Sequence, residues 1–204
     1  MAETTGVASH LLGTDATNIY NLVDKANVHG LNLTVPEHAR DVIKPWDQRD
    51  ETTKFAESNV DDQLILHIPF IENVRVRAIL LKLGRGEVTP RRLRIFINSP
   101  SSSDFGDLED IKPHLDIALQ DGETGIIEYP LRAPSFTNTN SVTLFFSDSS
   151  EGDQSRVFYV GFKGVTNAAK KEEANEIETP AANSADALLD AVREKRANKQ
   201  DRIQ

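Results

Sequence analysis

The amino-acid sequence predicts an all-β fold for the middle of the chain, an antiparallel sandwich or barrel. Between residues 61 and 164, apolar residues recur at every second position in seven short runs, the spacing of side chains on one face of a strand. The breaks between these runs hold turn-forming residues such as glycine, proline, asparagine and aspartate. No run in this region has the spacing of a crossover helix, so the strands are expected to pair antiparallel.

Each of these runs predicts a strand with one face in the core and one face outward. We expect Leu66, Ile95 and Leu144 to point inward, and Phe96 and Phe146 to face different sides of their strands. The residues expected to face the core are Leu64, Leu66, Ile68 and Phe70; Val74, Val76, Ala78 and Leu80; Leu93, Ile95 and Ile97; Leu115, Ile117 and Leu119; Ile127, Tyr129 and Leu131; Val142, Leu144 and Phe146; and Phe158, Val160 and Phe162.

The segment before the strands is polar and contains one short helical pattern. Residues 17–28 are expected to form a short N-terminal helix, because Ile19, Leu22 and Val23 fall at helical spacing and Asp15 can cap its start. The sequence after Gly30 predicts an extended segment. We therefore expect a flexible N-terminus at residues 1–16 and a single domain at residues 17–166.

The segment after the strands changes character. Residues 167–183 are rich in charge and contain no aromatic residue, so they lack the apolar area needed to fold alone and predict a flexible linker. In residues 184–204, Leu188, Leu189 and Val192 form an apolar stripe at helical spacing, which predicts an amphipathic tail helix over 184–199. This helix either packs back on the domain or enters a groove of a partner.

The composition argues against several classes of function. The 204 residues include 23 Lys and Arg against 32 Asp and Glu, a net charge of −9, which disfavours nucleic acids and anionic membrane surfaces as partners. The absence of cysteine excludes disulfides, thiolate zinc sites and a cysteine nucleophile. No apolar run approaches ~20 residues and no leader pattern opens the chain. We expect a monomer located in the cytoplasm and nucleus.

Catalytic and metal-binding patterns are not found in the sequence. The five histidines do not lie at metal-ligand spacing from one another, and His67 is expected on the outward side of its strand. Neither a Gly-x-Ser-x-Gly elbow nor a phosphate-binding glycine loop is present. We therefore expect no catalytic residue, no metal and no cofactor, and a protein that is not an enzyme.

Two patterns are candidates for binding. Arg75 and Arg77 share one face of their strand, as do Arg92 and Arg94, so the four arginines would form a basic patch if the strands lie close together. The alternative is a solvated strand face. The acidic cluster at residues 57–63 is expected to hydrogen-bond backbone amides at the entry to the first strand, and a calcium site is the alternative.

Several ordered motifs resemble those of the PITH domain family. The run from Glu57 to Leu66 is similar to the family's Glu-Ser-Asp-x-Asp-x-Gln-Leu-Leu signature, and the Leu31-Asn32 pair is similar to its Leu-Asn pair. The resemblance covers roughly residues 17–166. The matching motif positions are Glu57, Ser58, Asp61, Asp62, Gln63, Pro69, Phe70, Pro90, Asn98, Gly161 and Gly164.

The resemblance implies a fold and a partner. It implies a jelly-roll β-sandwich like that of galactose-binding modules, and association with the 26S proteasome, with contact expected at its regulatory particle. Because the chain contains no cysteine and no thioredoxin domain, it is similar to the stand-alone branch of the family. The expected function is a non-catalytic adaptor or regulator. The alternative is a small-ligand or carbohydrate-binding jelly roll, although one tryptophan and 6% aromatic residues provide few sugar-stacking surfaces.

The residues expected to bind the partner come from both regions. They are Arg75, Arg77, Arg92, Arg94, Leu188, Leu189 and Val192.

Overall fold

The computed structural model describes residues 18–120, 125–131, 134–149 and 152–167. The predicted linker, the tail helix with Leu188, Leu189 and Val192, and the capping residue Asp15 lie outside these residues. The described strands are β1 (His29–Leu31), β2 (Ala56–Glu57), β3 (Leu64–Leu83), β4 (Pro90–Ile97), β5 (Leu115–Ala118), β6 (Ile127–Pro130), β7 (Thr139–Ser149) and β8 (Arg156–Thr166). The short helices are α2 (His38–Asp41) and α3 (Phe105–Asp110), with 3₁₀ turns η1 (Tyr20–Leu22), η2 (Trp46–Gln48), η3 (Gly86–Val88) and η4 (Pro134–Thr137).

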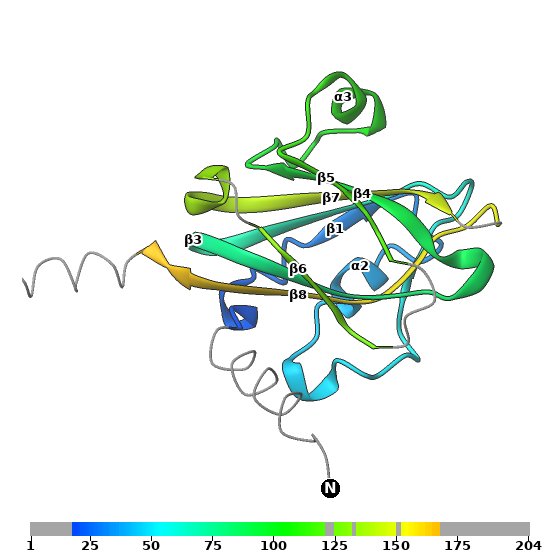
Figure 1. Cartoon of the computed structure of the whole chain (residues 1–204), viewed down its shortest axis with the longest axis horizontal. Coiled ribbons are helices and arrows are strands. Elements are labelled where there is room, and N and C mark those ends of the chain that lie inside the picture. Colours follow the sequence, from blue (N-terminus) through cyan, green and yellow to red (C-terminus); the bar gives the residue numbers. More distant parts are fainter. Residues whose placement is uncertain (1–17, 121–124, 132–133, 150–151, 168–204) are drawn as a thin grey trace, which may run out of the picture. The chain divides into compact units, whose positions relative to one another are not determined.

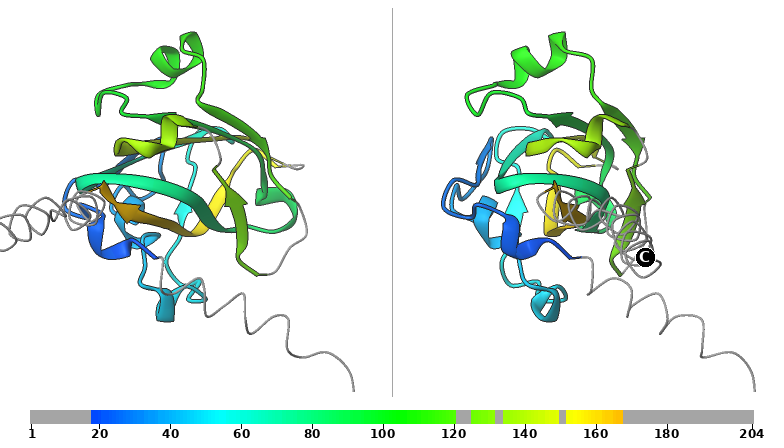
Figure 2. Two further views of the ribbon diagram at one scale, coloured as in Figure 1. Left: turned by 60° about the vertical axis from the view of Figure 1, so that its left-hand side comes forward. Right: turned by 90° about the vertical axis from the view of Figure 1, so that its left-hand side faces the viewer.

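The 20-residue strand β3 connects two layers of antiparallel sheet (Figures 1 and 2). Its first half pairs with β7 from Leu64 to Pro69, and its second half pairs with β8 from Val74 to Leu83, with a register shift between the halves. The first layer has the order β5-β4-β7-β3-β1, and the second has the order β6-β3-β8-β2. The predicted antiparallel sandwich is therefore confirmed, with the first two predicted runs joined in one strand.

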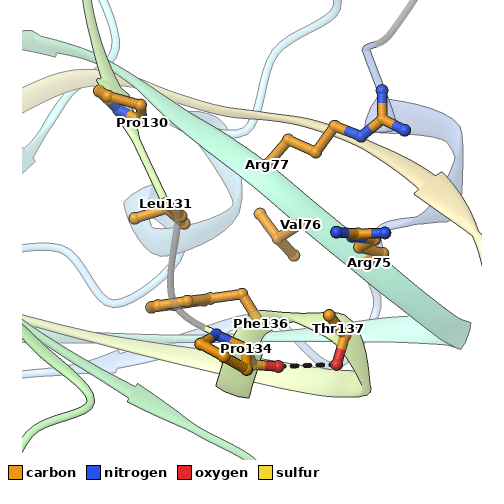
Figure 3. A pocket seen from close by; sticks show the side chains of 8 residues that line it. All are labelled: Arg75, Val76, Arg77, Pro130, Leu131, Pro134, Phe136 and Thr137. Atoms are coloured by element: carbon orange, nitrogen blue, oxygen red, sulfur yellow. Dashed lines mark hydrogen bonds between the residues drawn. The ribbon is translucent and has the colours of Figure 1, made fainter.

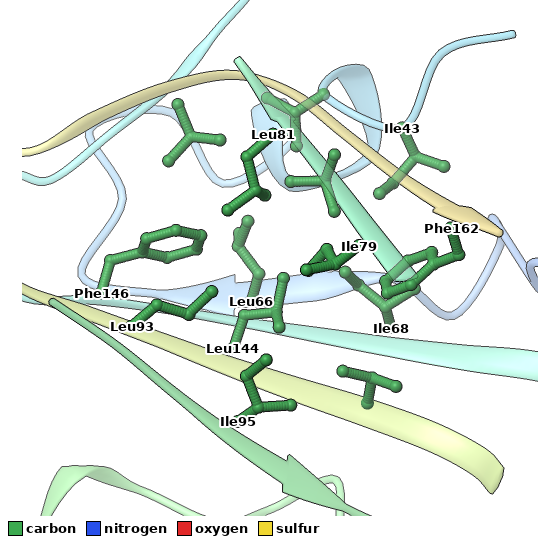
Figure 4. Close-up of a cluster of buried hydrophobic side chains, with 14 of the residues drawn as sticks. Ile43, Leu66, Ile68, Ile79, Leu81, Leu93, Ile95, Leu144, Phe146 and Phe162 are labelled. Atoms are coloured by element: carbon green, nitrogen blue, oxygen red, sulfur yellow. The ribbon is translucent and has the colours of Figure 1, made fainter. Parts of the chain in front are cut away.

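The hydrophobic core lies between the two layers (Figure 4). Leu66, Ile95 and Leu144 are completely buried in it, which confirms their predicted orientation. Phe146 also lies in this core, whereas Phe96 packs in a second cluster beneath α3, on the other face of the first layer. The two phenylalanines therefore face opposite sides, as predicted. The core side chains labelled in Figure 4 are Ile43, Leu66, Ile68, Ile79, Leu81, Leu93, Ile95, Leu144, Phe146 and Phe162.

A β-bulge changes the predicted phase of the second run. On β3, Val76 pairs with Gly164 and Ala78 with Lys163, so Arg77 is an extra residue with no counterpart on β8. Val74 and Val76 face the core as predicted. Beyond the bulge the alternation is inverted, and Ile79, Leu81 and Leu83 take the core positions that were expected for Ala78 and Leu80.

A second irregularity corrects the last run. Lys82 pairs with Tyr159 and Leu83 with Val157, which leaves Phe158 unpaired. The core residues of β8 are therefore Val157, Val160 and Phe162. The predicted core residue Phe158 is half-buried instead, with its ring 5.8 Å from the ring of Phe55.

The helix predicted at residues 17–28 is reduced to the single turn η1. The reason is that the residues around this turn bridge to the sheet: Asn18 to Lys163 of β8, and Val23 to Phe70 of β3. The apolar residues at this spacing therefore contact the sheet and do not form one face of a helix. Conversely, α2 and α3 were not predicted. A capping box between Asp104 and Asp107 starts α3, which is too short for a recognisable periodicity.

Candidate functional site

The four candidate arginines lie in two separate pairs. Arg75 and Arg77 lie on the second half of β3, beside β8 and before the stretch that pairs with β6, whereas Arg92 and Arg94 lie on β4, between β5 and β7. These strands belong to different layers of the sandwich. The single basic patch that the sequence allowed is therefore not formed, and each pair has its own surroundings.

Arg92 and Arg94 make contacts within the domain. The Arg92 guanidinium donates two hydrogen bonds to the Asp116 carboxylate across β4 and β5, with lengths of 3.0 and 2.7 Å. These bonds and the opposite charges raise the pKa of Arg92 and lower the pKa of Asp116. The Arg94 guanidinium lies 3.8 Å from the ring centroid of Phe145 and is half-buried. Both guanidinium groups therefore already have a contact within the domain in the absence of a partner.

Arg75 and Arg77 line an open groove of about 580 Å³ (Figure 3). The groove lies where two strands diverge from the same side of β3: Val74 still pairs with Thr139 of β7, and Ala78 pairs with Pro130 of β6. The turn η4, which precedes β7, forms the opposite wall. The lining residues are Arg75, Val76, Arg77, Pro130, Leu131, Pro134, Phe136 and Thr137.

The charge of the groove contrasts with that of the domain. Residues 1–167 hold 16 of the 23 basic and 24 of the 32 acidic residues, a net charge of −8. On the described strands, ion pairs are formed by Lys82, Arg92, Arg156 and Lys163. Arg75 and Arg77 are exposed, and neither has an ion-pair partner in the part of the chain that the structure describes. The groove therefore presents positive charge on an acidic body.

Hydrogen bonds between asparagine side chains and loop backbone hold the rim of the groove. The Asn98 side chain accepts from the backbone N–H of Asn140 at 2.7 Å and donates to the carbonyl of Asn138 at 3.0 Å, which fixes the start of β7. Asn167 donates to the carbonyl of Thr137 at 2.9 Å, and the Thr137 hydroxyl donates to Pro134 at 2.7 Å. The wall formed by η4 is thus tied to residues that directly follow β4 and β8.

Gly164 explains why β8 can lie so close to the groove strand. A side chain at this position would press into the backbone carbonyl oxygen of Arg75. At Gly161, a side chain would collide with the ring of Tyr159, which is buried over that residue. Both glycines of the closing motif therefore permit close packing on β8, and Gly164 sets the position of Arg75.

The acidic cluster fastens a loop. Asp61 accepts from the backbone N–H of Gln63 at 3.1 Å, and Asp62 accepts from the backbone N–H of Ser149 at 2.7 Å. For Asp61 and Asp62, these bonds confirm the interpretation that the cluster serves backbone amides at the entry to β3, whereas Glu57 pairs with the Arg156 guanidinium instead. Asn32, in the left-handed region at φ 56°, donates to Asp61 and to the Gln63 carbonyl at 2.7 and 2.6 Å. Hydrogen bonds therefore connect the Leu31-Asn32 pair to the acidic cluster at residues 57–63.

The remaining motif positions also have structural contacts. Ser58 is buried, and its hydroxyl accepts from the backbone N–H of Ser155 at 2.8 Å. The Pro69 carbonyl accepts from Asp24 at 2.9 Å, the ring of Phe70 lies 5.4 Å from the ring of Phe162, and Pro90 begins β4. These four motif positions therefore make contacts within the fold.

His67 lies on the outer face of its layer, as predicted, yet its side chain is buried. The ring of His29 lies 5.0 Å away over it, and its Nδ1 is 2.9 Å from the Thr143 hydroxyl. Burial, followed by the neighbouring His29, lowers the pKa of His67 to about 4. Among the described residues, no group of three or more histidines, aspartates and glutamates is placed to hold a metal ion.

Trp46 was the aromatic residue considered for a sugar platform. It lines a smaller hollow of about 340 Å³ together with Asn18 and Tyr20. The Arg49 guanidinium lies 4.1 Å from its ring centroid, so one face of the ring is already covered.

None of the described helices is both long and apolar enough to span a bilayer.

Sequence reasoning found the two arginines of the groove but missed its other walls. Pro130 ends β6, and Leu131, Pro134 and Phe136 follow it in the connection between β6 and β7; Leu131 had been assigned only to the core. One signal was available: Pro134 follows the predicted strand that ends at Leu131, and proline favours a rigid connection that does not pair in a sheet.

Comparison with known proteins gives consistent results for the domain. The sequence model of a family described as "PITH domain" matches residues 10–182. The chain is 29% identical over 180 residues to "PITH domain-containing protein 1" of Dictyostelium discoideum, covering 87% of this chain and 89% of that protein. It is 30% identical over 158 residues to the Homo sapiens protein of the same name, covering 78% of this chain and 74% of that protein.

Solved structures with a similar fold come from Clostridium perfringens. The CBM32-1 and CBM32-2 domains of ZmpB match with a TM-score of 0.54 and 10% identity, over 84% of this chain and 43% of that chain. The CBM32-3 domain of a family 31 glycoside hydrolase matches with a TM-score of 0.51 and 8% identity, over 74% of this chain and 97% of that chain. At such identities the likeness concerns the fold, and it confirms the predicted galactose-binding-like jelly roll.

Proposed function

Because the chain belongs to the PITH domain family, we propose that it is a non-catalytic interaction protein that binds the 26S proteasome as an adaptor or regulator. The family resemblance implies the 26S proteasome as the partner, and we expect the first contact at its regulatory particle. The observation that supports a binding role is the groove of Arg75 and Arg77: two exposed cations without a described ion-pair partner, at a rim tied by hydrogen bonds.

The two arginine pairs differ in what binding would require of them. Arg75 and Arg77 have no ion pair among the described residues, so they can donate to a carboxylate of the partner without first giving one up, and a guanidinium matches a carboxylate with two parallel hydrogen bonds. Arg92 would have to leave Asp116, and Arg94 would have to leave the face of Phe145. We therefore assign the primary contact to the groove and a secondary one to Arg92 and Arg94.

The tail contributes a proposed second contact. The stripe of Leu188, Leu189 and Val192 lies outside the described residues, and its role follows from its helical spacing alone. A second site tethered to the first raises the overall affinity through effective concentration, by ~10²–10⁴-fold when both sites can be engaged together.

The carbohydrate-binding alternative receives less support. The similar solved domains share the fold at identities of 8% and 10%, which transfers no ligand. Arg49 covers one face of Trp46, so this ring does not offer an open stacking surface on that side.

Affinity purification with the full chain as bait tests the proposed function. From a eukaryotic cell extract containing ATP, the bait is expected to recover subunits of both the regulatory particle and the core particle of the 26S proteasome, identified by mass spectrometry. A bait with Arg75→Glu and Arg77→Glu is expected to recover several-fold less, because two attractive contacts become repulsive.

The matched control carries Arg85→Glu and Lys112→Glu, which make the same change in net charge at two exposed positions away from the groove. This control is expected to recover proteasomes as well as the wild type does. If the wild-type bait is folded by circular dichroism and recovers no proteasome subunits, the proposed function is wrong.

A further inference from the structure

We propose that the groove of Arg75 and Arg77 recognises a short extended segment of the partner protein in which an apolar side chain stands beside carboxylates. This inference rests on the proposed function for the identity of the partner, but the chemistry of the segment follows from the groove itself. The groove combines two guanidinium groups that have no ion pair among the described residues with apolar walls in which two positions are proline, a residue without a backbone N–H.

The bulge on β3 places the two cations. Because Arg77 is an extra residue in the strand, it stands next to Arg75 and Val76 without a partner on β8. Figure 3 shows the side chains of Arg75 and Arg77 leaving β3 on either side of Val76. Because Val76 itself faces the core, an extended segment lying along this stretch would meet the two guanidinium groups. Two neighbouring guanidinium groups match a segment that carries two carboxylates.

The apolar part of the groove has a definite position. Val76, Leu131 and Phe136 are buried and form its floor, while Pro130 and Pro134 are exposed at its walls. Proline has no backbone N–H, so these walls offer no donor for adding another strand. The segment is therefore expected to be held by its side chains, the apolar one against the prolines and the acidic ones at the arginines, rather than by a β-ladder.

The groove suits a short segment rather than a folded surface. Its volume of about 580 Å³ falls within the ~300–1,000 Å³ of sites that hold a drug-sized ligand, which corresponds to a few side chains. The hydrogen bonds from Asn98 to the Asn138 carbonyl and from Asn167 to the Thr137 carbonyl hold the wall in place before binding, so little conformational entropy is lost when the segment docks.

Titration of the ¹⁵N-labelled full chain with synthetic peptides tests the inference. The probe is an acetylated and amidated Asp-Glu-Leu-Glu-Asp peptide. Two comparison peptides replace its acidic residues with Asn and Gln, or its Leu with Ala. We expect the probe to shift the backbone amide resonances of Arg75, Val76, Arg77, Phe136 and Thr137, while each comparison peptide binds at least ~10-fold more weakly, because charged hydrogen bonds and an apolar contact are lost.

Variants assign the binding to the groove. Arg75→Ala with Arg77→Ala is expected to weaken the probe by at least ~10-fold, whereas Arg85→Ala with Lys112→Ala should change its affinity less than twofold. Equal weakening by both double variants would show general attraction to basic residues and would overturn the inference. Shifts that appear on raising the protein concentration without peptide would assign the groove to a second copy of this chain and would also overturn it.

The inference and the proposed function can fail separately. If proteasomes are recovered equally by the wild type and by the Arg75→Glu, Arg77→Glu bait, the groove is not the contact and the inference is wrong, while the proposed function stands. If the probe binds the groove as described but no bait recovers proteasomes, the ligand chemistry is supported and the identity of the partner is wrong.

Discussion

Replacing Leu66, Ile95 or Leu144 with alanine is expected to lower the free energy of unfolding by ~2–5 kcal/mol for each substitution. All three side chains have no exposed area and lie between the two layers of the sandwich, so each truncation leaves a cavity where tightly packed atoms were in contact. Guanidinium-induced unfolding of the full chain, followed by tryptophan fluorescence or circular dichroism, measures the change.

Val60→Ala is the matched control for these truncations. Val60 is 81% exposed at the tip of a loop, so its truncation is expected to change the free energy of unfolding by less than ~0.5 kcal/mol. Changes as small as this at all three core positions would contradict the assignment of these residues to the inner face of the sandwich.

The second large effect concerns pH. His67 has its pKa lowered from 6.5 to about 4 in the folded protein, because its burial disfavours the charged ring. The unfolded chain therefore binds more protons than the folded protein between these two values. The free energy of unfolding is therefore highest above pH 6.5 and decreases as the pH falls toward 4. His67 accounts for ~2 kcal/mol of this decrease between pH 7 and pH 5 and for ~3 kcal/mol in total.

Unfolding of the wild type and of His67→Gln at a series of pH values measures this contribution. The glutamine side chain cannot take up a proton, and it retains a polar group beside Thr143. We expect the stability of the variant to fall less steeply between pH 7 and pH 5, by the amount assigned to His67. Parallel profiles for the two proteins would show that His67 is accessible to protonation in the folded state.

The strands and their inward faces could be predicted from the sequence because most strands have one solvated face, which leaves a period of two. Leu66, Ile95 and Leu144 follow this period and were placed correctly. The period fails where the backbone carries an extra residue: Arg77 and Phe158 interrupt the alternation, and neither residue type signals a bulge. Residues beyond such a point, such as Ala78, were therefore assigned to the wrong face.

The candidate site was predicted only in part for a related reason. Alternation placed Arg75 and Arg77 on the surface, but the groove also depends on the connection between β6 and β7, which lies more than fifty residues away in the sequence. Phe136 and Pro134 reach the groove because β6 and β7 pair with different parts of β3. A pairing of this kind arises from the tertiary fold and leaves no local pattern.

The acidic cluster shows what a motif can mean. Asp61 and Asp62 were expected to bond backbone amides, and the structure confirms this, with Asn32 completing the network. A family signature can therefore mark residues that hold loops together, and the surface that meets the partner has to be sought elsewhere.

The most direct test of the account is the equilibrium binding of the full chain to purified 26S proteasome. Fluorescently labelled wild-type chain, the Arg75→Glu, Arg77→Glu variant and the Arg85→Glu, Lys112→Glu control are titrated with proteasome at constant ionic strength. We expect saturable binding of the wild type and the control with equal affinity, and at least ~10-fold weaker binding of the groove variant, since reversal removes two charged contacts and adds repulsion. Equal affinity of all three proteins would contradict binding through the groove, and no binding of the wild type would contradict the proteasome as the partner.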